Sequence, residues 1–342
     1  MNKKNLFYIV LTFLLFTIVN VWVVQFYDLN DFPIQRSVTF DEYIRTDYLE
    51  RIENEKPEIV AIGDSSIRQF NDSVFSEISG FRSSFFSAPG SGSAYWYLFI
   101  RNEILHARYY PKYVLVFFRG TTLTVPEFRV NGNYFIRLEE IAVPKDVDVF
   151  DKAVNSRKNQ WMLMLEKYIP IFAYRSEIYF NIVQSFRNYV PEKILGCDVN
   201  SIDRAYDVVF DDAQINDLLW EEHLLNIESV LYQPKALNFI ARVDHSFLPD
   251  MIQDLRAAEI TPVFIRVKYR SHAEGEKDSS ALISYLSELE AYIEKNGGMY
   301  VDLAQVEALS AEMFRDNFHI DEDYAGTATE IIAVVIRNYL NQ

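Results

Sequence analysis

The chain has 342 residues, of which 49% are hydrophobic, so it is long enough for one large domain or two small ones with an ample core. Its formal net charge of -16 argues against nucleic-acid binding, which needs a basic surface. Cys197 is the only cysteine, and CxxC, HExxH and glycine-rich phosphate motifs do not occur, so the sequence predicts no internal disulfide, no metal centre and no cofactor.

An apolar run near the N-terminus predicts a membrane anchor. Residues 6–24 are almost entirely apolar and follow Lys3 and Lys4. This length is close to the roughly 20 residues that span a bilayer, and the lysine pair predicts a cytoplasmic N-terminus. A cleaved signal peptide is the alternative, but residues 23–27 offer no small-x-small cleavage site. We therefore expect an uncleaved anchor over residues 1–27, with the rest of the chain in the periplasm or outside the cell.

The polar residues 28–57 are expected to tether this anchor to a domain over residues 58–342. That domain begins with a short strand at Ile59–Ile62, which is apolar and rich in β-forming residues. Gly63 ends the strand, and the sequence Asp64-Ser65-Ser66 then forms a turn before a helix.

Ser65 therefore lies at the carboxyl end of a strand and near a helix N-terminus. Sites in open α/β sheets are built at this edge, and helix N–H groups there favour a developing oxyanion. Ser65 is a candidate nucleophile, and Asp64 is expected to stabilise the turn around it. The alternative is that this serine only caps the turn, which is the commoner role of serine in turns.

Two further strands follow. Residues 81–87 read as the second strand, and the loop after it, residues 88–93, contains Gly90 and Gly92. Residues 94–110 have helical content and end before a proline. Residues 112–118 form a nearly continuous apolar run, as expected of a central parallel strand.

Residues 125–243 do not fit an alternation of strands and helices. We interpret them as a mostly helical insertion that caps the carboxyl edge of the sheet, with helices expected at Gln160–Lys167 and Ser176–Tyr189. Its many aromatic residues form either its own core or the lining of a sugar or acyl site. Three arginines are candidates for anion contacts or for surface ion pairs: Arg119, Arg175 and Arg242.

The alternation resumes after the insertion. Helices are expected at residues 246–258, 281–295 and 324–340, and strands at residues 261–267 and 299–303. Alternating strands and helices predict right-handed crossovers and a parallel sheet with helices on both faces.

Asp316 and His319 stand before the last helix, in the sequence Asp316-Asn-Phe-His319. A nucleophilic serine needs a histidine to accept its proton, and the histidine needs a carboxylate to fix its tautomer. One loop can present both groups. The other histidines are weaker candidates, namely His106, His223, His245 and His272.

The early Gly-Asp-Ser and the late Asp-x-x-His together resemble the SGNH, or GDSL-type, hydrolase superfamily. The resemblance implies a flavodoxin-like three-layer fold, Ser65 as nucleophile, and Asp316 and His319 as its partners. It also implies an oxyanion N–H from the glycine loop, at Gly90 or Gly92. A side-chain amide of the family is replaced here by Thr122, whose hydroxyl can donate one hydrogen bond.

Anchored proteins of this type resemble those that work beside membrane-bound O-acyltransferases. We therefore expect acyl transfer, such as O-acetyl transfer, from an acyl donor to a glycan acceptor in an exported polysaccharide or the cell envelope. A carbohydrate esterase has the same triad and is an alternative. The substitution by Thr122 also leaves open an inactive domain that only binds a glycan or a partner.

Overall fold

The computed structural model describes residues 3–26, 42–131, 133–156, 158–175, 178, 182 and 228–341. The chain divides into two compact units, one of residues 1–37 and 155–220 and one of residues 38–154 and 221–342. The expected insertion is therefore divided. Its two ends belong to the larger unit, and its middle belongs to the smaller unit, together with the N-terminal helix.

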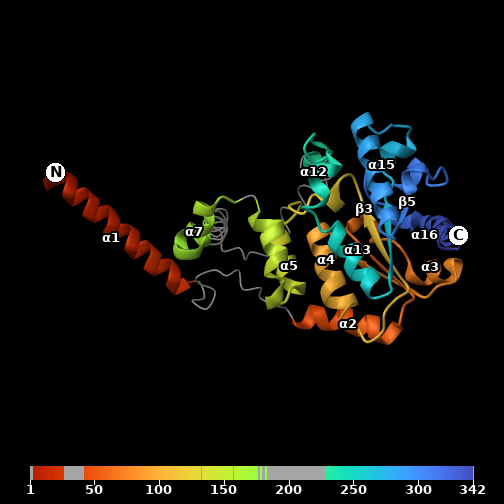
Figure 1. The fold of residues 1–342 in the computed structure, drawn as a ribbon, viewed down its shortest axis with the longest axis horizontal. Helices are drawn as coiled ribbons and strands as arrows, with labels where there is room; N and C mark the ends of the chain where they lie inside the picture. The colour runs from red at the N-terminus through yellow and green to blue at the C-terminus, as the bar shows by residue number, and fades with distance from the viewer. Residues whose placement is uncertain are drawn as a thin grey trace, which may run out of the picture. The chain divides into compact units, whose positions relative to one another are not determined.

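Five parallel strands form the centre of the larger unit (Figure 1). They lie in the order β2-β1-β3-β4-β5, which is the flavodoxin-like order of doubly wound sheets. The predicted parallel α/β sheet is confirmed, and each strand lies within two residues of its expected bounds. The strands are β1 (Ile59–Gly63), β2 (Ser83–Ser87), β3 (Tyr113–Phe118), β4 (Thr261–Arg266) and β5 (Met299–Asp302).

Helices cover both faces of this sheet. On one face Val60, Val116 and their neighbours pack against α4 (Ser93–Phe99), α13 (Leu248–Ala257) and α15 (Ser280–Lys295). On the other, Ala61, Phe117 and their neighbours pack against α3 (Asp72–Ser79) and α16 (Ala325–Leu340). Successive strand residues point to opposite faces, so one buried run supplies both cores. Figure 1 shows α4 and α13 on one side of the strands and α3 and α16 on the other.

The segment expected as a tether contains a helix of the larger unit. The helix α2 (Glu42–Glu55) buries Ile52 completely in the core beside α4. The guanidinium of Arg51 lies 4.7 Å from the centroid of the Phe86 ring and pairs with Asp72. Residues 42–55 are thus part of the folded unit. Their mostly polar sequence did not indicate that this helix buries one face.

The remaining helices are short. In the described part of the larger unit they include a π-helical turn at Ile100–Ile104 directly after α4, and α5 (Asn133–Ile141), α6 (Val147–Phe150), α12 (Phe239–Val243) and α14 (Arg270–Ala273). The last of these lies between β4 and α15. Apart from Ile178 and Ile182, the helix expected at Ser176–Tyr189 lies outside the described residues.

The smaller unit contains α1 (Lys3–Phe26), α7 (Gln160–Tyr168) and α8 (Pro170–Ala173). The stretch Lys4–Gln25 of α1 is long and apolar enough to cross a membrane, judged by its length and composition alone. The helix α7 confirms the expectation of a helix at Gln160–Lys167.

Candidate active site

Ser65 begins a short 3-10 turn directly after β1. Asp64 caps this turn, because its Oδ1 atom accepts the backbone N–H of Ser66 at 2.9 Å. Gly63 lets the chain lie close to the neighbouring strand β3, since a Cβ atom at position 63 would stand 3.0 Å from the Cβ of Phe117. The strand β1 therefore delivers the Ser65 hydroxyl to the carboxyl edge of the sheet.

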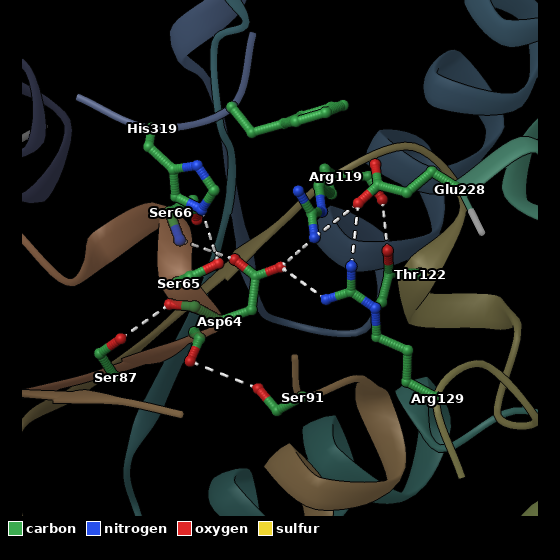
Figure 2. Close-up of polar contacts among 12 residues, drawn as sticks. Asp64, Ser65, Ser66, Ser87, Ser91, Arg119, Thr122, Arg129, Glu228 and His319 are labelled. Atoms are coloured by element: carbon green, nitrogen blue, oxygen red, sulfur yellow. Dashed lines mark hydrogen bonds and ion pairs between the residues drawn. The ribbon is translucent and has the colours of Figure 1, made fainter. Parts of the chain in front are cut away.

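His319 and Asp316 complete a chain of hydrogen bonds from Ser65 (Figure 2 shows the His319–Ser65 contact). The Nε2 atom of His319 lies 2.9 Å from the Oγ of Ser65, although 254 residues separate them. The Nδ1 atom of His319 lies 2.7 Å from the Oδ2 of Asp316. With the carboxylate as acceptor, Nδ1 carries the proton and Nε2 is free to accept the serine proton. This is the geometry that general-base activation of a serine requires.

The loop that carries the pair is held by Asp316 itself. Its Oδ1 accepts the backbone N–H groups of Phe318 and His319, both at 2.8 Å. Burial raises the pKa of Asp316, but the hydrogen bonds from the His319 ring and from these N–H groups lower it more, so its pKa lies below the ordinary value. The carboxylate is therefore ionised and able to orient the imidazole at neutral pH.

The glycine loop lies beside the Ser65 turn. The Ser87 hydroxyl donates to the carbonyl of Asp64 at 2.9 Å, and the Ala88 N–H donates to the carbonyl of Gly63 at 3.0 Å. Gly90 has φ +76°, and a Cβ atom there would stand 2.5 Å from the Cε1 of Tyr134. A Cβ at Gly92 would stand 2.9 Å from the carbonyl oxygen of Phe128. Close packing thus explains why glycine stands at both positions. The loop that contains them adjoins the turn of Ser65.

The Thr122 hydroxyl was expected to donate a hydrogen bond to the oxyanion, but it is used elsewhere. Its side chain is buried, and its hydroxyl donates to the carbonyl of Arg119 at 2.5 Å. A hydroxyl has one proton, which this bond uses, so the expectation of a Thr122 side-chain donor to an oxyanion is not supported.

A buried cluster of four charged side chains adjoins the Ser65 turn (Figure 2). The Nη2 of Arg119 lies 2.6 Å from the Oδ2 of Asp64 and 2.7 Å from the Oε1 of Glu228. Arg129 contacts the same two oxygens, with its Nη2 3.2 Å from Glu228 and its Nη1 3.8 Å from Asp64. All four side chains are at most 5% exposed. We call these four residues the ion cluster.

The ion cluster favours the charged form of Asp64 and Arg119, but burial disfavours the charged form of Glu228 and Arg129. Burial raises the pKa of Asp64, but Arg119 and Arg129 lower it more, so its pKa lies below the ordinary value. For Glu228 burial outweighs the two arginines, and its pKa is raised. Burial lowers the pKa of Arg119, but the two carboxylates raise it more, so this guanidinium stays charged. An ionised Asp64 is what holds the N–H of Ser66.

Sequence reasoning named Arg119 but missed Arg129 and Glu228. Nothing in a single sequence relates two residues of an insertion to a turn some 60 and 160 positions earlier in the chain. The other candidate arginines also pair within the protein. Arg242 contacts Glu127 at 2.5 Å, and Arg175 of the smaller unit contacts Glu166 at 2.9 Å. Each of the three thus makes an ion pair with a carboxylate of the protein.

Of the other histidines, His272 makes structural contacts. Its Nε2 lies 3.0 Å from the Oδ1 of Asp278, which also pairs with Arg266, and its ring stacks on Tyr269. The Nδ1 of His106 contacts the carbonyl of Arg101. His223 lies outside the described residues.

A cleft of about 480 Å³ adjoins the loop that carries His319. The hydroxyls of Tyr232 and Tyr269 lie 2.8 Å apart at its wall, and the Phe318 ring meets Tyr269 edge-on at 5.4 Å. Tyr232 comes from the insertion, whereas Phe128 and Leu231 form a small core there. Among the insertion's aromatic residues, Phe128 thus lies in a core of the insertion itself, and Tyr232 lines this cleft. The cleft is lined by Tyr232, Tyr269, His272, Asp278, Asn317 and Phe318, among others.

No group of three or more His, Cys, Asp or Glu side chains within the described ranges is arranged to hold a metal ion. The side chains that the site brings together are the Ser65 hydroxyl, the His319 imidazole and the Asp316 carboxylate.

No protein-family model matches the chain, and no curated protein is significantly similar to it in sequence.

Proposed function

We propose that this protein is an acyl-transfer enzyme of the SGNH type, in which Ser65, His319 and Asp316 form the catalytic triad. The observation that carries the proposal is the pair of contacts at 2.9 Å and 2.7 Å that join the serine, the imidazole and the carboxylate. The strand order and the position of Ser65 at the carboxyl end of β1 support it. The superfamily remains an analogy of motif order and fold.

The mechanism follows from the roles of these three groups. The Ser65 Oγ attacks an ester carbonyl while the Nε2 of His319 accepts its proton, and His319 then returns that proton to the leaving alcohol. The product is an acyl ester on Ser65. An acceptor hydroxyl attacks this ester, again with His319 as base. Asp316 stabilises the imidazolium in both steps. Backbone N–H groups of the Ser65 turn and of the Gly90–Gly92 loop hold the oxyanion.

The acceptor is proposed to be a glycan hydroxyl that enters by the cleft next to Phe318. Aromatic rings and hydroxyls at one wall suit a sugar, which presents an apolar face and a rim of hydroxyls. Tyr232 and Tyr269 provide such a wall, and hydroxyl-bearing Ser271 and Ser279 lie on the same cleft. A carbohydrate esterase would use the same groups, with water in place of the sugar hydroxyl.

The apolar helix α1 supports a location of this chemistry in the cell envelope. We propose that α1 spans the membrane with the lysine pair on the cytoplasmic side, so that the larger unit faces the periplasm or the exterior. We propose a membrane-bound O-acyltransferase as the source of the acyl group, by analogy with anchored proteins of this type. A reporter fused after Gln342 is expected to be active only outside the cytoplasm, and cytoplasmic activity would exclude an envelope glycan as acceptor.

The O-acyl content of envelope polysaccharide in cells that carry Ser65→Ala tests the direction of the reaction. A fall relative to cells with the wild-type protein supports transfer, and a rise supports deacylation. An unchanged content of every envelope glycan contradicts both. In that case, retained glycan binding by Ser65→Ala would favour the alternative of a domain that only binds.

A further inference from the structure

The helix α7 carries a stripe of large exposed side chains. Trp161 is 71% exposed, Met164 43% and Tyr168 63%. Their spacing of three and four residues places them on one face of the helix. We call these three residues the α7 stripe. Exposed apolar side chains gathered on one helix face mark a surface that another apolar phase covers.

The acidic residue of α7, Glu166, lies away from this stripe. Glu166 accepts from the Nζ of Lys158 at 2.7 Å and from Arg175 at 2.9 Å. The Glu166 and Lys158 side chains are only 12% and 13% exposed, so the pair faces inward. Lys167 is exposed, and its ammonium group lies 5.3 Å from the centroid of the Tyr168 ring. The helix is therefore amphipathic, with a basic residue at the edge of its apolar face.

The next helix, α8, contacts the apolar helix α1 within the same unit. The backbone N–H of Ile171 donates to the side-chain Oδ1 of Asn20 at 3.3 Å, and the nearby Val23 is only 1% exposed. Asn20 precedes the end of the apolar stretch, Gln25, by five residues. At 1.5 Å per residue, α8 thus meets α1 about 7 Å from the end of that stretch.

We infer that residues 158–175 form a second membrane element, which lies in the interface of the bilayer that α1 spans. Interfacial helices bury their apolar face about 5–10 Å into the boundary between headgroups and acyl chains, which matches the depth of the Asn20 contact. Trp and Tyr are enriched at this level, and a lysine beside them extends to the headgroups. The occupant of the α7 stripe is therefore the lipid around α1, and the inference rests on the proposal that α1 is a membrane anchor.

The depth of single spin labels in the full-length protein tests this. Cys197→Ser removes the native thiol, and single cysteines then replace Trp161, Met164 or Tyr168. Lys167→Cys serves as a control beside the α7 stripe, and Leu14→Cys reports on α1 itself. Collision rates with oxygen, which partitions into the bilayer, and with a water-soluble nickel chelate are measured in protein reconstituted into phospholipid vesicles.

We expect the ratio of oxygen to nickel collisions at the three α7 stripe positions to be at least a few-fold higher than at Lys167→Cys. If the stripe labels collide freely with nickel while Leu14→Cys shows bilayer depth, the segment lies in water and the inference is wrong. Low rates for both reagents mean that protein covers the stripe, which also contradicts it. Nickel access at Leu14→Cys shows instead that the anchor proposal itself has failed.

A measurement that keeps the native side chains gives a second check. Trp161 fluorescence, obtained as the difference between the wild type and Trp161→Phe, should be quenched by brominated lipids. An unquenched difference spectrum contradicts the inference, even where a cysteine variant fails to fold.

Discussion

Arg129 and Glu228 lie 3.2 Å apart in a buried ion pair, although 99 residues separate them in the chain. They stand near the two ends of the insertion, and both contact the groups that surround Asp64. Both end segments of the insertion thus contact the charged groups around Asp64, the residue that precedes Ser65. Contacts from the insertion, as well as the strand β1, therefore hold the turn that presents Ser65.

Removing one partner from the ion cluster should be costly. In Arg119→Leu the carboxylates of Asp64 and Glu228 stay buried and keep only Arg129 as a counter-charge. Breaking a buried pair in this way destabilises a protein by about 3–5 kcal/mol. The exposed pair of Arg270 and Glu274 offers a matched control, for which Arg270→Ala should cost no more than about 0.5 kcal/mol. Urea denaturation of the two variants measures both values, and similar small losses would contradict the role given to the ion cluster.

The stability given by Asp64 should depend on pH in one direction. Its folded-state pKa is lowered, so the stabilisation is fully present above the unfolded value of about 3.9 and is lost as the pH falls through the folded pKa. Asp64→Asn should therefore be less stable than the wild type at pH 7, and this difference should shrink below about pH 4. Urea midpoints of both proteins at several pH values check this. A difference that persists unchanged into strong acid would show that the charge of Asp64 is not its cause.

Two glycines with similar torsions separate backbone strain from close contact. Gly80 has φ +79° and would give a Cβ atom open space, whereas a Cβ at Gly90 would stand 2.5 Å from the ring of Tyr134. Gly80→Ala should cost about 1–2 kcal/mol of stability, from the left-handed conformation alone, and should leave activity intact. Gly90→Ala should cost more and should also lower the rate of acylation at Ser65, because its loop must move beside the serine. Equal rates of acylation at Ser65 in the two variants would show that the Gly90 loop does not contribute to the site.

Tyr232 should affect the acceptor more than the nucleophile. Tyr232→Ala removes one wall of the cleft and the hydrogen bond to Tyr269, but leaves the triad contacts in place. Loss of such a contact should raise the KM for a glycan acceptor about tenfold, with little change in the reaction of Ser65 with a small acyl donor. Tyr339→Ala is the control, since this tyrosine lines a different pocket, and it should change neither quantity. Equal losses of both activities in Tyr232→Ala would point to a folding defect.

Most of the strands were predictable because they are short apolar runs whose length and β-forming residues are local properties, whereas β2 has only two apolar residues, Phe85 and Phe86. Ser65 was predicted from its place at the end of a strand, and its grouping with Asp316 and His319 from two motifs, an early Gly-Asp-Ser and a late Asp-x-x-His, whose order resembles the SGNH superfamily. The helix α2 was missed because its sequence is mostly polar, and among its described side chains Ile52 is fully buried while Tyr48 and Leu49 pack partly against the same core. Tertiary packing, rather than periodicity, decides such a helix.

The ion cluster and the Thr122 contact were not predictable, because both depend on how distant segments meet. Arg129 and Glu228 are ordinary charged residues until the fold buries them together. The sequence could suggest the Thr122 hydroxyl as a donor to the oxyanion because it does not show the actual acceptor, the nearby carbonyl of Arg119. Short polar side chains often bond to nearby backbone in this way, so a hydroxyl in a turn is weak evidence for a free donor.

The most direct test of the account is covalent labelling of the full-length protein by a fluorophosphonate, read by mass spectrometry of its peptides. We predict a single label on Ser65 in the wild type, none on Ser65→Ala, and normal labelling of Ser66→Ala, in which the backbone N–H that Asp64 accepts is kept. His319→Ala should slow the labelling by about a thousandfold or more, because the serine then lacks its base. Labelling that is as strong in Ser65→Ala or in His319→Ala as in the wild type would contradict the assignment of Ser65 as a nucleophile that His319 activates.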